Sequence, residues 1–132
     1  MSLKVRLFSF GYNKSGIPID NSGNGGGFVF DCRYIYNPGR LEEFKNFTGR
    51  DKIIIDFLDG DETMQNFLQE VISIIKPAIE NYISRDFTDL MISFGCTGGQ
   101  HRSVYSAEKI NTYIKKTFPE VIMEIIHREL KQ

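Results

Sequence analysis

A chain of 132 residues, of which 41% are hydrophobic and 25% charged, has enough apolar material for the core of one globular domain. Its net charge of -1 excludes a generally basic surface, so any anion site must depend on a local concentration of positive charge. The two cysteines, Cys32 and Cys96, form no dense pattern, which favours a reducing compartment over a secreted disulfide scaffold.

No apolar run approaches the roughly 20 residues that a membrane-spanning helix needs. The amino terminus leads directly into a strand pattern instead of a signal peptide. We therefore expect a cytoplasmic protein without membrane contact, folded as a single domain over residues 1–132.

The first part of the chain combines two strand patterns with loops. Val5–Phe10 and Phe28–Phe30 are rich in aromatic and β-branched residues, which predicts strands. Between them, the glycine-rich residues 21–27 predict a mobile surface loop. Residues 37–39 predict a turn, and residues 41–47 predict a short helical turn.

Two helices are expected next. Asp51 is a suitable N-cap for a short helix over Lys52–Leu58, and Asp61 or Glu62 begins a longer one. In the longer helix, apolar residues recur at helical spacing. They are Phe67, Leu68, Val71, Ile72, Ile74, Ile75 and Ile79. Pro77 falls inside this pattern, which predicts a kink or a restart of the helix.

The last part predicts a strand at Leu90–Phe94, a helix at Ser103–Phe118 and a strand at Val121–Ile126. Strands that alternate with helices predict an α/β fold, with a single largely parallel or mixed sheet flanked by helices. In such sheets ligands collect at the carboxyl ends of the strands. The segments expected there are Ser9–Tyr12, Asp31–Arg33, Gly95–Arg102 and His127–Arg128.

The loop at residues 95–104 has the composition of an anion-binding site. It follows a strand pattern, contains Gly98 and Gly99, and leads into a helix. The backbone N–H groups at a helix N-terminus are unpaired, and the helix dipole favours negative charge there. Arg102 adds a planar guanidinium that suits phosphate, and Ser103 adds a hydroxyl. In the alternative interpretation, the two glycines only allow a tight turn.

The same loop has the Cys-x5-Arg-Ser spacing of cysteine phosphatases, with Cys96 as nucleophile and Arg102 as phosphate ligand. Two features weigh against catalysis. Gly95 stands where those enzymes carry a histidine, and no aspartate is clearly presented as the general acid. The conceivable candidates are Asp20, Asp31 and Asp59.

Other polar residues give weaker indications. Asp31 and Arg33 could bind a ligand or form a structural ion pair, while Cys32 is expected to be a small buried residue. His101 and His127 match no standard metal-ligand spacing, so we expect no metal. The chain has no Gly-x4-Gly-Lys-[Ser/Thr] motif, and its basic residues are scattered among acidic ones.

Taken in order, several segments make the chain similar to the C-terminal domain of the RapZ (YvcJ) family. The most specific is the loop Gly-Cys-Thr-Gly-Gly-Gln-His-Arg-Ser-Val at residues 95–104. The full set is Ser9–Tyr12, Gly16–Asp20, Val29–Pro38, Thr48–Asp51, Gly95–Val104 and His127–Leu130.

The resemblance implies an α/β fold similar to part of phosphofructokinase. It also implies a bacterial domain that senses glucosamine-6-phosphate, binds small regulatory RNAs and acts as an adapter for an RNase, with no cofactor. The implied ligand-binding residues are Cys96, Thr97, Gly98, Gly99, Gln100, His101, Arg102 and Ser103. The implied site neighbours are Asp31, Arg33, Asn37 and His127.

The sequence also departs from the family pattern. Members carry an N-terminal P-loop kinase-like domain that these 132 residues do not include. We therefore expect no ATPase or GTPase activity. A name such as P-loop ATPase would then describe the missing domain and not these residues. A kinase-like partner could be encoded separately. Residues 23–27 resemble an insertion, and the short, weakly basic tail at residues 129–132 weakens the expectation of RNA binding. An oligomer is compatible with the sequence, and the Cys96-dependent phosphatase is the alternative function.

Overall fold

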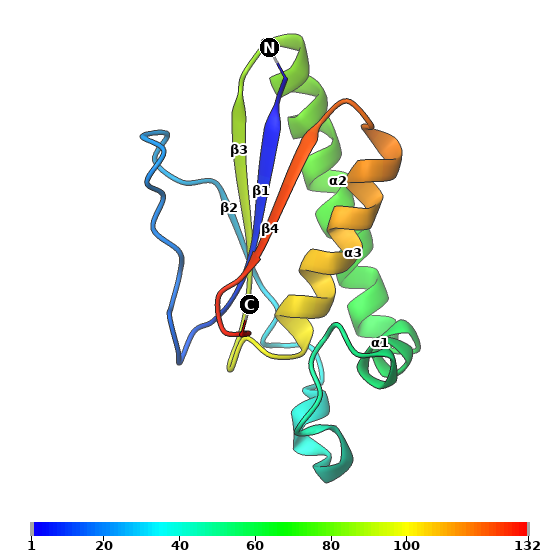
Figure 1. Cartoon of the computed structure of the whole chain (residues 1–132). Coiled ribbons are helices and arrows are strands. Elements are labelled where there is room, and N and C mark those ends of the chain that lie inside the picture. The colour runs from blue at the N-terminus through cyan, green and yellow to red at the C-terminus, as the bar shows by residue number, and fades with distance from the viewer. Residues whose placement is uncertain (1, 132) are drawn as a thin grey trace.

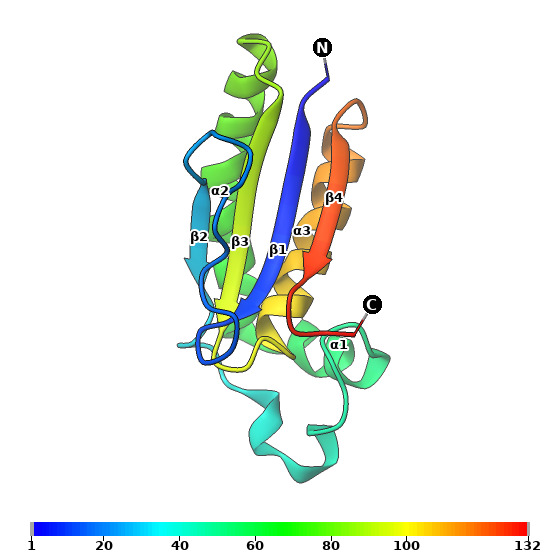
Figure 2. The same cartoon turned by 60° about the vertical axis from the view of Figure 1, so that its left-hand side comes forward.

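Four parallel strands form one sheet in the order β2-β3-β1-β4 (Figures 1 and 2). The strands are β1 (Lys4–Gly11), β2 (Phe28–Asp31), β3 (Asp89–Cys96) and β4 (Ile122–His127). This computed structural model describes residues 2–131, so both ends of the expected domain, Met1 and Gln132, lie outside the described residues. The predicted α/β fold with a parallel sheet is confirmed.

Three α-helices accompany the sheet, namely α1 (Lys52–Asp59), α2 (Glu62–Ser84) and α3 (Arg102–Thr117). Both α2 and α3 pack on the same face of the sheet, and residues 12–27 cross the opposite face (Figures 1 and 2). Two short 3-10 helices, η1 (Pro38–Arg40) and η2 (Glu42–Phe44), lie in the connection from β2 to α1.

The core lies between the sheet and the helices, as the hydrophobic periodicity predicts. The face of α2 that carries Phe67, Val71, Ile75 and Ile79 is buried. On α3, Val104, Ala107, Ile110 and Ile114 are all buried, while Tyr113 is half-buried. Each buried aliphatic side chain stabilises the fold by roughly 1.5–3 kcal/mol relative to exposure.

Of the two alternatives predicted at Pro77, a kink or a restart, the restart does not occur. Helix α2 continues through Pro77 to Ser84. Proline removes the hydrogen bond to the carbonyl four residues earlier, and that residue, Ser73, is exposed and can be hydrated. Asp61 is a true N-cap, because its carboxylate accepts a hydrogen bond from the Met64 N–H at 2.8 Å. Asp51 precedes α1, but its carboxylate accepts instead from the Thr48 N–H at 2.7 Å.

Because all four strands are parallel, their carboxyl ends lie at one edge of the sheet. Gly11 pairs in register with Cys96, Asp31 with Gly95, and Ser9 with His127. The segments that the sequence predicts to converge therefore leave the sheet at the same edge. Within residues 2–131, no helix is both long and apolar enough to cross a membrane.

Candidate functional site

The loop between β3 and α3 lies directly against the end of β1. Gly99 has a φ of +71°, a conformation that only glycine adopts easily. A Cβ atom at Gly99 would lie 2.6 Å from the Gly11 nitrogen, and one at Gly11 would lie 2.7 Å from the Gly98 carbonyl carbon. The backbone conformation and the close approach to β1 therefore both require glycine at position 99. Gly98 has open space around it.

A cavity of about 410 Å³ opens beside this loop, within the size range of ordinary small-molecule sites. Its walls come from the loop, from the start of α3 and from the segment that follows β2. The lining residues are Asn37, Gly39, Lys45, Cys96, Thr97, Gly98, Gln100, His101 and Arg102.

Arg102 is the most unusual residue of this cavity, because its side chain is only 3% exposed and makes no ion pair within residues 2–131. Its Nη1 donates hydrogen bonds to the carbonyl oxygens of Arg33 and Ile35, each at 2.8 Å. Its Nη2 has only a long contact of 3.5 Å to the Thr97 hydroxyl, and the buried Nε has no partner within the described chain. A buried cation without a counter-ion is costly, so an anion at this position would stabilise it.

Gln100 and His101 hold the opposite wall in place. The Gln100 amide donates to the carbonyl oxygens of Lys45 and Phe47 at 2.7 and 2.8 Å. His101 Nε2 lies 3.0 Å from the Phe44 carbonyl oxygen, which requires the tautomer protonated at Nε2. Burial lowers the pKa of His101, so the ring is neutral at pH 7 and supports the wall without adding charge.

Cys96 is buried at the inner end of the loop, beside the Ser103 hydroxyl. Its Sγ lies 3.1 Å from the Ser103 hydroxyl, and the residue is 2% exposed. Two of the conceivable acids have other partners: Asp20 pairs with Arg6, and Asp59 accepts from the Tyr105 hydroxyl at 2.6 Å. Cys32 is fully buried as expected, and burial raises the pKa of its thiol.

The expected site neighbours divide into two groups. Asn37 lines the cavity, where its Oδ1 accepts from the Gly39 N–H at 2.9 Å. Asp31 and Arg33 form an exposed ion pair at 2.8 Å near this edge, outside the cavity lining. The hydrogen bonds from Arg33, supported by the charge of Arg102, lower the pKa of Asp31.

Three other predicted residues do not line the cavity. Gly99 packs against β1, and Ser103 is fully buried beside the Cys96 thiol. His127 has Nδ1 2.6 Å from the Ser9 hydroxyl and Nε2 2.7 Å from a Glu108 carboxylate oxygen, so it joins β1, β4 and α3. Ser9 is completely buried, which makes this arrangement inaccessible to a substrate.

The sequence analysis missed two lining residues, Gly39 and Lys45. Gly39 belongs to a recognised turn signal, but nothing local shows that this turn folds back toward residues 97–101. The direct link is long-range: the Gly49 N–H donates to the Gln100 carbonyl oxygen at 2.9 Å. Within residues 2–131, no group of three or more side chains is arranged to hold a metal ion.

Comparison with known proteins identifies the family of this chain. The sequence profile described as "RapZ C-terminal domain" matches residues 3–131. The chain belongs to the RapZ C-terminal domain family.

Relatives from several bacteria agree with this assignment, and each carries the name "Nucleotide-binding protein". A Clostridium kluyveri protein is 38% identical over 131 residues, covering 98% of this chain and 42% of its own length. The corresponding Lactobacillus helveticus protein is 36% identical over 128 residues, covering 97% of this chain and 41% of its own length. One from Thermosipho africanus is 33% identical over 127 residues, or 96% of this chain and 42% of its own length. This RapZ C-terminal domain thus spans about two fifths of the curated relatives that it matches.

Proposed function

We propose that the cavity beside the β3–α3 loop binds a small phosphorylated ligand of the phosphorylated amino sugar class, such as glucosamine-6-phosphate. The observation that carries this proposal is the guanidinium of Arg102, which is buried, lies at the cavity wall and makes no ion pair within residues 2–131. The amino sugar itself comes from the family resemblance. The phosphate preference comes from the chemistry of the cavity.

The phosphate would lie against the start of α3. His101, the residue before the helix, makes no side-chain cap, so the first N–H groups of α3 keep their ability to bind an anion. The Thr97 hydroxyl and Arg102 Nη2 face each other at 3.5 Å across this end of the cavity. A phosphate oxygen that accepts hydrogen bonds from both groups would give Arg102 the charged partner that it lacks.

The sugar would extend toward Asn37 and the end of β2. Asp31 is ionised at neutral pH, and Arg33 and, more weakly, Arg102 lower its pKa further. Asp31 lies outside the cavity lining, so an ammonium group that reached it would compete with Arg33 for this carboxylate. His127 is an unsuitable second contact, because it is buried between Ser9 and Glu108.

Nucleotide binding in the named relatives does not transfer directly to this domain. The chain has no P-loop motif and covers about two fifths of those proteins. A nucleotide is nevertheless a phosphorylated ligand, so it belongs in the test. RNA binding and an adapter role for an RNase rest on the resemblance alone. If RNA binds, its affinity should fall steeply with salt.

Titration calorimetry tests the proposal with glucosamine-6-phosphate, glucose-6-phosphate, glucosamine and AMP. We expect binding that requires the phosphate and weakens without the amine. Removing the Thr97 hydroxyl in Thr97→Val and exchanging the guanidinium for an ammonium in Arg102→Lys should each weaken binding, the latter about tenfold or more. Arg50→Lys, at an exposed position outside the cavity, is the matched control.

Circular dichroism and urea unfolding of each variant separate loss of the site from loss of the fold. Equal affinity for glucosamine-6-phosphate and glucosamine would refute the phosphate assignment. Tighter binding of AMP than of the sugar phosphate would replace the amino sugar with a nucleotide.

A further inference from the structure

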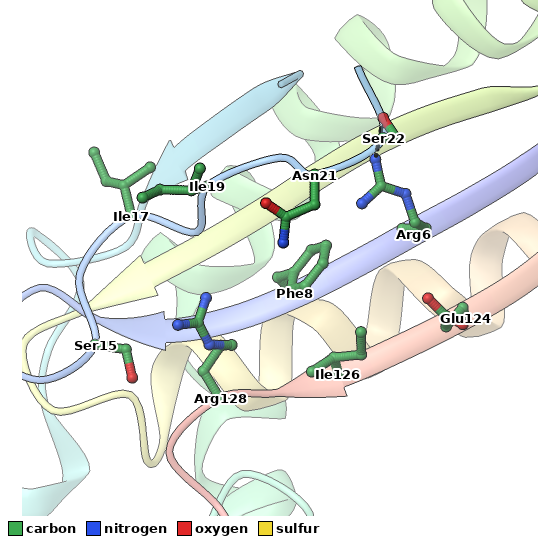
Figure 3. Close-up of a pocket in the computed structure, with 10 residues that line it drawn as sticks. All are labelled: Arg6, Phe8, Ser15, Ile17, Ile19, Asn21, Ser22, Glu124, Ile126 and Arg128. Atoms are coloured by element: carbon green, nitrogen blue, oxygen red, sulfur yellow. Dashed lines mark hydrogen bonds between the residues drawn. The ribbon is translucent and has the colours of Figure 1, made fainter. Parts of the chain in front are cut away.

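The face of the sheet opposite α2 and α3 carries a second cavity, which the proposed function does not use. Parallel sheets are normally covered on both faces, but here residues 12–27, which we call the strap, are the only covering segment within residues 2–131 (Figure 2). A cavity of about 550 Å³ lies between the strap and strands β1 and β4 (Figure 3). It is lined by Arg6, Phe8, Ser15, Ile17, Ile19, Asn21, Ser22, Glu124, Ile126 and Arg128.

Hydrogen bonds at both ends fix the strap over this cavity. Near its start, the Glu129 carboxylate accepts from the N–H groups of Gly11 and Ser15 at 3.1 and 3.0 Å. Near its other end, the Asp20 carboxylate accepts from Arg6 Nη2 at 2.9 Å and from the Ser22 N–H at 2.9 Å. Contacts within the chain therefore hold the strap in place, and such preorganisation lowers the entropic cost of binding.

Apolar side chains form the floor and one wall of the cavity. Phe8 on β1 and Ile126 on β4 project from the sheet, and Ile17 and Ile19 project from the strap (Figure 3). Ile17 is 54% exposed and Ile19 is 84% exposed. A ligand with an apolar body would remove this surface from water, which favours binding.

Two of the three charged lining residues have their charges compensated. Arg6 pairs with Asp89 at 2.8 Å and with Asp20 at 2.9 Å, and Glu124 pairs with Lys4 at 3.3 Å. Arg128 makes no side-chain hydrogen bond or ion pair within residues 2–131, and its charge acts only through space on the Glu129 carboxylate, whose pKa it helps to lower. Its guanidinium rises from the end of β4 toward the strap, and the Asn21 amide projects toward the same space above Phe8 (Figure 3).

We propose that this cavity binds a small monocarboxylate with an aromatic or branched aliphatic body. The planar carboxylate matches the fork of the Arg128 guanidinium, and the body covers Phe8 and Ile126. Because Glu124 in the same lining is paired with Lys4, the preference for a carboxylate with an apolar body rests on Arg128 and the apolar lining, and inorganic phosphate serves as the competitor in the test. This site is independent of the phosphorylated ligand proposed above.

The test is an NMR titration of the ¹⁵N-labelled chain with 4-phenylbutyrate, with 4-phenylbutyramide as the neutral analogue. We expect the largest amide shifts in the strap and around Ile126–Arg128, and roughly tenfold weaker binding of the amide. Arg128→Gln should weaken the carboxylate about tenfold and leave the amide unchanged. The matched control Arg50→Gln removes another exposed arginine, outside this cavity, and should change neither affinity.

Several outcomes would overturn the proposal. One is equal affinity for acid and amide, and another is tighter binding of inorganic phosphate than of 4-phenylbutyrate at this face. A third is self-association in sedimentation, accompanied by amide shifts in the strap on dilution, that 4-phenylbutyrate does not reverse. A parallel titration with glucosamine-6-phosphate, followed at residues 97–102, reports on the other cavity, so failure of either proposal can be recognised separately.

Discussion

Gly98 and Gly99 are neighbours in sequence, yet the structure predicts opposite consequences when each is replaced by alanine. The Gly99 backbone has a φ of +71°, and an added Cβ would lie 2.6 Å from the Gly11 nitrogen and 2.8 Å from the Phe10 carbonyl carbon. These are backbone atoms, so no rotamer change can relieve the overlap. A Cβ at Gly98 meets no other atom within 4 Å.

The expected cost of Gly99→Ala follows from two effects. Holding alanine in a left-handed conformation costs about 1 kcal/mol. The loop must also move away from β1, which weakens the hydrogen bonds from Tyr12 N–H to the Cys96 oxygen at 2.8 Å and from Asn13 N–H to the Thr97 oxygen at 3.1 Å. At about 1 kcal/mol for each bond, the free energy of unfolding should fall by about 3 kcal/mol in total.

Urea unfolding followed by circular dichroism measures this difference. With a denaturant slope of about 2 kcal/mol per molar, the midpoint of Gly99→Ala should fall by about 1.5 M. The midpoint of Gly98→Ala should remain within about 0.3 M of the wild type. Its methyl group enters the cavity, so this variant should instead bind glucosamine-6-phosphate more weakly. Equal destabilisation by the two substitutions would refute the reasoning.

Two further predictions concern a carboxylate and the thiols. Hydrogen bonds from the Ser22 N–H and hydroxyl, from Gly26 and from Arg6 hold the pKa of Asp20 well below its usual range. The stability that this carboxylate contributes is therefore complete above the unfolded pKa of about 4 and is lost as the pH falls below it. Wild type should have a higher urea midpoint than Asp20→Asn at neutral pH, and this difference should become smaller below pH 4. Because Cys32 and Cys96 are 0% and 2% exposed, a disulfide reagent should label neither thiol until urea unfolds the chain. Rapid labelling of the native protein that disappears in Cys96→Ser, together with turnover of an aryl phosphate, would support the phosphatase instead.

The sequence predicts the strands and helices well because local periodicity reflects burial. The helix predicted at Ser103–Phe118 occurs at Arg102–Thr117, and the strand predicted at Val121–Ile126 occurs at Ile122–His127. A parallel sheet then requires the strand ends to share one edge. The loop at residues 97–101 could therefore be placed at the correct edge from the order of elements alone.

The polar contacts that shape the two cavities could not be predicted in this way. Arg6 meets Asp89 across 83 positions, and Glu129 meets Ser15 across 114. No local pattern specifies such pairs, because they depend on how the strap and the tail return to the sheet. The same limitation applies to Lys45, which lines the cavity beside residues 97–101, and to His127, whose ring contacts Ser9 and Glu108 on two other elements.

Because the net charge is close to zero, an anion site must depend on positive charge that is concentrated locally. The arginines show how the fold provides this local charge. Arg6 and Arg33 are neutralised by Asp89 and Asp31 at 2.8 Å each. Arg102 is held by backbone carbonyl oxygens, which orient its guanidinium without neutralising it. A carboxylate in their place would cancel the charge that an incoming phosphate needs, so support by carbonyl oxygens keeps the cavity positive while fixing its geometry.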